Sequence, residues 1–251
     1  MSKLHLFADG GYSFLEGGFP YSQGVIAAAG FALHRVRFTR PVPMAQGFAW
    51  IRQHLTQAQR PLTALAACEL RSPEAFTLQG FKDFNKAYVQ VLTDWGLFRN
   101  DLNPVGRSNL APQFNAPQEP GFYAFTYTMP EESTAPRDWV IAGSGEWPED
   151  QPFPEGIIAR GDLSPSGIAT KAHYVLDTMQ ARARGLQADW SRLTGAQVYT
   201  VHDFAHLVAP EFAARGMLGP GLSWHVCRPP IQELAFEMDV RSVRHESVAH
   251  V

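Results

Sequence analysis

The stretch Trp139-Val140-Ile141-Ala142-Gly143-Ser144-Gly145 joins a short apolar run to a glycine-rich end. An apolar run of this length bounded by glycine predicts a buried strand that ends in a turn. The pair Ser164-Pro165 follows, and serine at the N-cap with proline at the first helical position predicts the start of a helix. This order of strand, turn and helix begins a structural unit.

The rest of the second half extends this unit. Apolar residues at helical spacing follow the predicted helix start, namely Ile168, Ala172, Val175, Met179 and Ala183. Strands are predicted over 195–201, 223–227 and 234–243. A helix over 204–214 contains Pro210, which interrupts it because proline lacks an amide donor.

The first half repeats the same order. Strands are predicted over 24–33, with 36–38 as a partner, and over 62–70 and 121–129. Helical stripes lie between them, formed by Met44, Phe48, Ile51 and Leu55, which Pro61 ends, and by Phe81, Phe84, Tyr88, Val91 and Trp95. Each half thus predicts a β-β-α-β-α-β-β unit of the α+β class, a mixed sheet with two helices on one face.

Residues 130–136 are charged, flanked by proline and free of large apolar side chains, which predicts a linker. We therefore expect a first domain over residues 1–132 and a second over residues 133–251.

Composition restricts the class of protein. The chain has 251 residues, 45% of them hydrophobic, which excludes a disordered chain. Its 21 Lys and Arg against 24 Asp and Glu give no overall attraction for nucleic acid or an anionic membrane. No run approaches the ~18 apolar residues that span a bilayer, and the first residues lack a signal-peptide pattern. We expect a cytoplasmic protein without nucleic-acid or membrane partners.

Metal and nucleophile motifs are weak. Cys68 and Cys227 lack zinc-ligand spacing and are expected to be reduced core thiols. His202 and His206 have helical i, i+4 spacing, but no third ligand is evident, so no metal site is expected. The sequence around Ser144 departs from the G-x-S-x-G pattern of serine hydrolases.

Several segments resemble the RidA (YjgF) family. In the second half they are 142–145, 196–201, 228–230 and 236–240, and in the first half they are 20–24, 81–88 and 107–108. The two tandem copies are similar to the two-domain 2-aminomuconate deaminases of aminophenol and nitroaromatic degradation. The resemblance implies a chorismate-mutase-like barrel that hydrolyses enamines or imines to ketones and ammonia without a cofactor.

The resemblance also implies roles for particular residues. Arg107 in the Arg107-Ser108 pair would hold a substrate carboxylate, and Glu237 would position water and act as general base and then acid. Tyr21 and Ser144 would line the pocket. Each copy has lost what the other keeps, since 219–223 lacks the arginine and Ala124 replaces the glutamate. We therefore expect one composite site between a first-half and a second-half surface.

A muconate carries a second carboxylate, for which His225, Arg228 and Arg99 are candidates. The resemblance thus implies a deaminase that converts 2-aminomuconate, or a substituted relative, to 4-oxalocrotonate and ammonia. Two alternatives stay open, a generic deaminase of 2-iminopropanoate-type acids and a non-catalytic protein that binds small acids. A chorismate-mutase-like isomerase rests on fold analogy alone.

A half-barrel sheet with helices on one face must bury its other apolar face against a partner. We therefore expect a homo-oligomer, a trimer or a multiple of one, with a small dicarboxylate as ligand.

Overall fold

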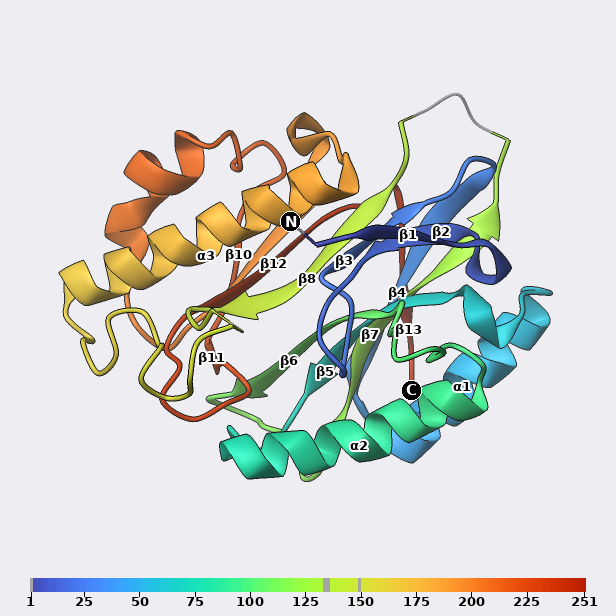
Figure 1. Cartoon of the computed structure of the whole chain (residues 1–251), viewed down its shortest axis with the longest axis horizontal. Coiled ribbons are helices and arrows are strands. Elements are labelled where there is room, and N and C mark those ends of the chain that lie inside the picture. The colour runs from blue at the N-terminus through green and yellow to red at the C-terminus, as the bar shows by residue number, and fades with distance from the viewer. Residues whose placement is uncertain (1, 133–135, 149) are drawn as a thin grey trace.

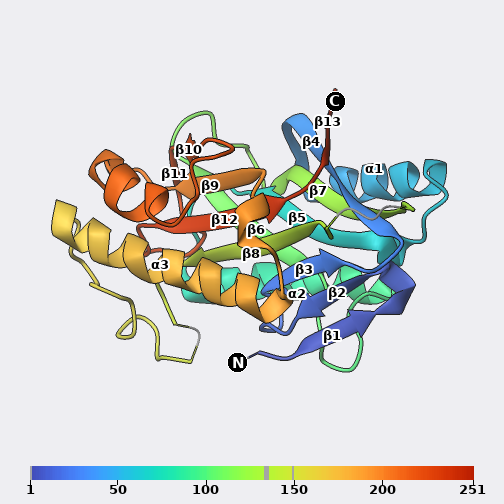
Figure 2. The same cartoon turned by 90° about the horizontal axis from the view of Figure 1, so that it is seen from above.

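Two β-sheets lie face to face between helices in the computed structural model, which describes residues 2–132, 136–148 and 150–251 (Figures 1 and 2). Helix α3 covers the outer face of one sheet, and α1 and α2 cover the outer face of the other. Smaller apolar clusters lie between the sheets. The layers therefore place polar residues from both sheets in the interior.

The first sheet has the order β1-β2-β3-β8-β12-β9-β10. Its strands are β1 (Leu4–Phe7), β2 (Tyr12–Leu15), β3 (Gly24–Ala27), β8 (Trp139–Gly145), β12 (Glu237–Ser242), β9 (Gly195–Tyr199) and β10 (Ser223–His225). Helix α3 (Pro165–Leu186) packs on it through the predicted apolar face. The hydroxyl of Ser164 accepts a hydrogen bond from the Gly167 amide at 3.2 Å, which confirms the predicted N-cap.

The second sheet has the order β11-β6-β5-β7-β4-β13. Its strands are β11 (Cys227–Arg228), β6 (Gly106–Pro112), β5 (Leu65–Arg71), β7 (Gly121–Pro130), β4 (Phe31–Pro43) and β13 (His245–Ala249). Helices α1 (Met44–Gln57) and α2 (Leu78–Asp94) follow the two predicted stripes. The short helices are η1 (Ala8–Gly10), η2 (Leu62–Ala64), η3 (Trp190–Arg192), η4 (Ala205–Leu207) and η5 (Val208–Ala213).

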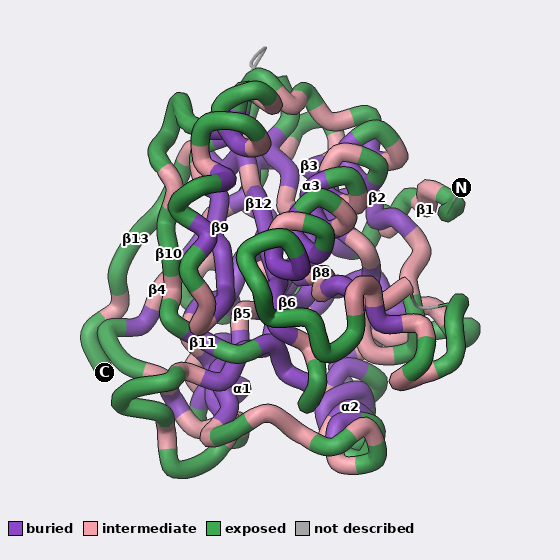
Figure 3. Tube along the Cα trace, turned by 90° about the vertical axis from the view of Figure 1, so that its left-hand side faces the viewer, coloured by how far each residue is buried: buried purple, intermediate pink, exposed green. Residues whose placement is uncertain are grey.

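Strands from the two halves of the sequence are exchanged between the sheets. β3 pairs with β8, with Gly24 opposite Ile141. β13 pairs in parallel with β4, and it forms an exposed edge (Figure 3). The mixed α+β fold is thus confirmed, while both sheets cross the expected boundary between residues 132 and 133. Residues 133–135 of the expected linker lie outside the described residues.

Three predicted elements were wrong in detail. The expected strand over 24–33 is divided between β3 and β4 by a turn in which Gly30 has a φ of +81°, and 36–38 continues β4 rather than forming a partner. The expected helix over 204–214 is a short 3-10 turn followed by a π-helical turn. Pro210 lies within it and cannot donate the hydrogen bond of a regular helix.

The cysteine prediction is confirmed, since Cys68 and Cys227 are both free and buried. Within the described residues, no helix combines the length and the apolar character needed to cross a membrane.

Candidate active site

A cavity of about 400 Å³ is lined by residues from both halves of the chain. Four of the predicted site residues line it, Tyr21, Arg107, Ser144 and Glu237. Its other polar lining residues are Lys82, Asn85, Lys86 and Asn109, and its apolar walls include Phe19, Leu78, Phe81, Trp147, Ile231 and Leu234. The composite arrangement expected from the sequence is therefore present within a single chain.

Strand geometry brings the two halves of this site together. Side chains alternate along a strand, so Arg107 and Asn109 of β6 share one face. Glu237 is the first residue of β12 and is opposite Gly145 of β8, while its carboxyl group lies close to Gly143. A Cβ at Gly143 would lie 2.4 Å from Glu237 Oε1 and 2.9 Å from Ser108 Cβ. Only glycine at this position lets the carboxyl group and β6 approach β8 so closely.

Arg107 is buried and only partly paired. Its Nη2 donates a hydrogen bond to Asn85 Oδ1 at 2.7 Å, and its guanidinium carbon lies 4.8 Å from the Tyr88 ring centre and 5.1 Å from that of Tyr21. Nη1 is buried and has no hydrogen-bond partner among the residues that the structure describes. Burial lowers the pKa of Arg107, yet arginine stays charged at neutral pH. Such an unmet charged donor suits a carboxylate ligand.

Glu237 is buried in the same cavity. Burial raises its pKa well above the usual value, and the nearby carboxyl groups of Asp239 and Glu146 raise it further. Arg182 and Arg107 oppose this rise only in part. The raised pKa favours the protonated form of Glu237, the form that can donate a proton.

A buried ion pair supports the segment that precedes Glu237. The carboxylate of Glu146 accepts hydrogen bonds from the amides of Ala235 at 2.6 Å and Phe236 at 3.1 Å. Lys171 Nζ lies 3.3 Å from the same carboxylate, and both side chains are fully buried. These contacts fix the backbone from which the Glu237 side chain enters the cavity.

The other predicted residues near the cavity differ in position. Tyr21 presents its ring to Arg107, and Ser144 lies on β8 at the cavity wall. Ser108 does not line the cavity, because its neighbour Arg107 takes the cavity face of β6. Its hydroxyl is buried with no hydrogen-bond partner in the described part of the chain.

The structure places the three candidates for the second carboxylate outside the cavity. His225 lies on β10 at the sheet edge, where Nε2 is 3.2 Å from Gln197 Oε1, and burial lowers its pKa to about 4. Arg228 is exposed and donates to Gln113 Oε1 at 3.2 Å, because β11 pairs with the far end of β6. Arg99 forms a surface ion pair. The prediction that His225 and Arg228 bind substrate in this cavity was therefore wrong, because neither residue lines it.

Two buried asparagines of the cavity were missed by sequence reasoning. Asn85 lies between Phe81 and Tyr88 in the apolar stripe of α2, and a buried amide in such a stripe is a usable signal. Asn109 lies two residues beyond Arg107, and its Nδ2 is buried with no partner within residues 2–132, 136–148 and 150–251. Asn109 Oδ1 accepts a hydrogen bond from the Ser72 hydroxyl at 2.9 Å, so Nδ2 of the same amide points away from Ser72. Asn109 Nδ2 is thus a second donor, beside Arg107 Nη1, that has no partner among the described residues.

Two exposed lysines of α2 also line the cavity. Lys82 and Lys86 are four residues apart, so they share one face of the helix. Lys86 pairs with Asp83 at 2.9 Å at the surface. These ammonium groups, rather than Arg228 or His225, provide positive charge where the cavity meets solvent.

Comparisons with known proteins agree over nearly the whole chain. The family described as 2-aminomuconate deaminase CnbZ matches residues 4–247. A 2-amino-5-chloromuconate deaminase from Comamonas testosteroni is 42% identical over 250 residues, which cover 99% of this chain and 100% of that protein.

Two solved structures were compared with this chain, and one of them, a chorismatase, shows a likeness of fold. The chorismatase has a TM-score of 0.50 at 10% identity, covering 91% of this chain and 79% of that one. The YjgF protein of E. coli has a TM-score of 0.33 at 19% identity, covering 45% of this chain and 84% of that one.

Proposed function

Because the chain belongs to the 2-aminomuconate deaminase family, we propose that it hydrolyses 2-aminomuconate, or a substituted relative, to 4-oxalocrotonate and ammonia. It would thus be a hydrolase of carbon–nitrogen bonds. The observation that carries the proposal is one cavity lined both by Arg107, whose Nη1 has no partner among the described residues, and by Glu237, whose pKa burial raises.

The cavity suits a dicarboxylate of this length. One carboxylate accepts hydrogen bonds from Arg107 Nη1 and Asn109 Nδ2, both buried and unmet among the described residues. The other carboxylate lies toward Lys82 and Lys86, which line the same cavity. Ligand pockets of small molecules commonly enclose about 300–1,000 Å³, and the volume here lies within that range.

Glu237 can perform the whole proton transfer at the reacting carbon. In the imine tautomer, its acid form protonates the nitrogen and makes C2 electrophilic. The resulting carboxylate takes a proton from the attacking water and returns it to the nitrogen, which leaves as ammonia. The proton of the new hydroxyl then goes back to Glu237 as the C2 carbonyl forms. The balance is imine plus water to ketone plus ammonia, with no cofactor.

The Arg107→Ala variant tests the proposal. Loss of a charge-assisted hydrogen bond of about 1.5–3 kcal/mol should lower kcat/KM for freshly generated 2-aminomuconate by about 10- to 100-fold. Ammonia release is measured, and Arg192→Ala, which removes an exposed arginine of η3, is the matched control. Equal rates for Arg107→Ala and the unmodified protein would remove Arg107 from the mechanism.

A substrate panel separates the proposal from the alternatives. Turnover of 2-iminopropanoate at the same kcat/KM as 2-aminomuconate would favour a generic imine deaminase. Tight binding of small acids with no turnover of any enamine would favour a non-catalytic protein.

We also propose that the protein forms a homotrimer or a multiple of one. In support, Phe114, Trp224 and Val226 are exposed at 70%, 46% and 39%. Trp224 lies on the edge strand β10, Val226 lies between β10 and the edge strand β11, and Phe114 lies just beyond β6. A single-chain mass in light scattering would contradict this assembly.

A further inference from the structure

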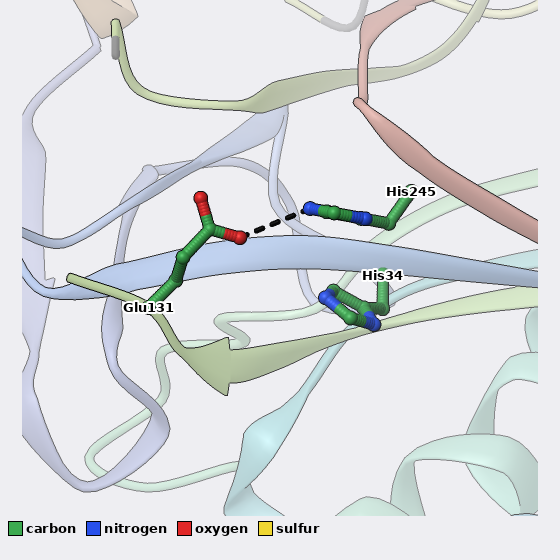
Figure 4. Close-up of side chains that lie close together, drawn as sticks. All are labelled: His34, Glu131 and His245. Carbon is green, nitrogen blue, oxygen red and sulfur yellow. Dashed lines mark hydrogen bonds and ion pairs between the residues drawn. The ribbon is translucent and has the colours of Figure 1, made fainter. Parts of the chain in front are cut away.

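Two histidines and a glutamate from three neighbouring strands meet away from the cavity (Figure 4). His34 lies on β4, His245 on β13, and Glu131 directly after β7. One nitrogen or oxygen atom of each side chain lies within 4.8 Å of those of the other two. No motif in the sequence announces this cluster, because its members are far apart along the chain.

The pairing of β4 with β13 places the two imidazoles side by side. His245 is directly opposite His34 in the parallel ladder, so both rings project from the same face. Their ring centres are 4.4 Å apart and their planes differ by 27°. Two nitrogens bound to one zinc ion at about 2.0–2.1 Å lie about 3.3 Å apart in a tetrahedron. The candidate ligand atoms lie within 4.8 Å of one another, so the side chains must rotate to bring them to that separation around an ion.

Glu131 is held so that one carboxylate oxygen faces the rings. Its amide donates to the Gly30 carbonyl at 2.9 Å, which extends the pairing of β7 with β4. Arg244 binds Glu131 Oε1 at 2.7 Å, while Oε2 lies 3.0 Å from His245 Nε2. Arg244 also pairs with Asp138 at 2.8 Å, so a further carboxylate offsets its positive charge near the cluster.

We propose that His34, Glu131 and His245 bind one zinc ion, with water as the fourth ligand. Imidazole nitrogen and carboxylate oxygen are ordinary zinc ligands, and three protein ligands leave one coordination position open. His245 is 45% exposed, so the ion and the water can enter from solvent. On zinc binding, bonds from His245 and Glu131 to the ion would replace their hydrogen bond, and its proton would be released to solvent.

The ion would fasten the edge of the second sheet. Four of the five residues of β13 are exposed, so little apolar burial holds this strand in place. Zinc bonds to β4, β13 and the end of β7 would join three adjacent strands. They would also hinder the open edge of β13 from pairing with another chain.

Metal binding by the full chain tests the proposal. After removal of metals with a chelator, the protein is dialysed against zinc chloride, and bound zinc is measured by mass spectrometry. We expect about one zinc per chain, and at least about tenfold weaker binding in His245→Ala and Glu131→Gln. When the metal-free unmodified protein is loaded with cobalt(II) instead of zinc, it should show the visible absorption of a tetrahedral cobalt(II) site. Zinc should raise the Tm of the unmodified protein but not the Tm of His245→Ala.

His5→Ala is the matched control, because His5 forms a two-residue pair with Glu16 at 2.8 Å. This variant should bind as much zinc as the unmodified protein. Substoichiometric zinc in the unmodified protein, or equal binding by His245→Ala, would overturn the proposal. The readout is metal content, so its failure leaves the deaminase proposal untouched.

Discussion

Two sets of buried acidic and arginine side chains in this chain are built in opposite ways. Between the sheets, Arg35 donates to both carboxylate oxygens of Glu69, at 2.6 and 2.8 Å. In the cavity, Arg107 binds an asparagine amide instead of a carboxylate, and Glu237 lies among other carboxyl groups. The paired arginine lowers the pKa of Glu69, whereas burial raises that of Glu237.

The difference lies in what compensates burial. Transfer of a charge out of water is costly, and a hydrogen-bonded partner of opposite charge offsets that cost. Glu69 has such a partner and stays ionised, so its pair joins strands β4 and β5. No oppositely charged partner of Glu237 lies at that distance among the described residues, so burial raises its pKa and favours the form that can donate a proton. The paired charges of Arg35 and Glu69 thus stabilise the fold, whereas the separated groups of Arg107 and Glu237 are available to bind a ligand.

Breaking the paired set should have the largest effect. Arg35→Met leaves the Glu69 carboxylate, which is 13% exposed, without its partner. The free energy of unfolding in urea should fall by about 3–5 kcal/mol. Arg35→Met combined with Glu69→Leu should recover much of that loss, because both members of the Arg35–Glu69 pair are then removed. A loss below about 1 kcal/mol in the single variant would contradict this view of the pair.

A change at Glu237 should lower activity strongly and leave stability nearly unchanged, the reverse of a change at Arg35. Glu237→Gln removes the proton donor but keeps the shape of the neutral side chain. We expect kcat to fall by about 100-fold, or about 2.7 kcal/mol, since general acid–base catalysis contributes at least that much. The free energy of unfolding at pH 7 should not decrease. An unfolding loss as large as that of Arg35→Met would show that Glu237 is structural.

Stability against pH should separate the two carboxyl groups. The lowered pKa of Glu69 gives stability that is present above the unfolded pKa of about 4.3 and lost as pH falls through the folded pKa. The raised pKa of Glu237 gives stability that is present below that unfolded value and lost as pH rises through the folded pKa. Urea unfolding of Glu69→Gln should therefore lose acid sensitivity, and that of Glu237→Gln should lose alkaline sensitivity. Unchanged profiles would contradict both assignments.

The exposed lysines should give the smallest effect. Lys82→Ala and Lys86→Ala should each raise KM for 2-aminomuconate by about threefold, because exposed ion pairs contribute only about 0.2–1 kcal/mol. KM for a monocarboxylate imine should not change. The effect should shrink at high salt, and Lys3→Ala, which lies outside the cavity, provides the control. Equal changes for both substrates would remove the lysines from recognition of the second carboxylate.

Sequence reasoning reached the residues that a family pattern or a local rule specifies. The Ser164 cap and the apolar face of α3 follow from spacing alone, and the family resemblance predicted that Arg107 and Glu237 would face a common cavity. It missed Asn109 because β6, with the sequence Gly-Arg-Ser-Asn-Leu-Ala-Pro, has no apolar alternation typical of a buried strand.

The sequence did not allow us to predict which strands far apart along the chain pair with each other. Nothing local in 245–249 shows that it pairs with β4, and the zinc ligands depend on that pairing. His225 and Arg228 were placed wrongly for a similar reason. Their positions depend on which strands β10 and β11 join, and partner choice depends on the whole fold.

The exchange of strands between the sheets has a consequence for how this protein is made. When the ribosome has released only β1 to β7, β3 has no neighbour on one side and β4 has an open edge. Neither gap closes until β8 and then β13 have been synthesised. Until then the first half is incompletely folded, and the unpaired edges of β3 and β4 can pair with another nascent chain. Truncations that remove β13, or tags that hinder its pairing with β4, should increase aggregation during expression more than changes at any surface loop.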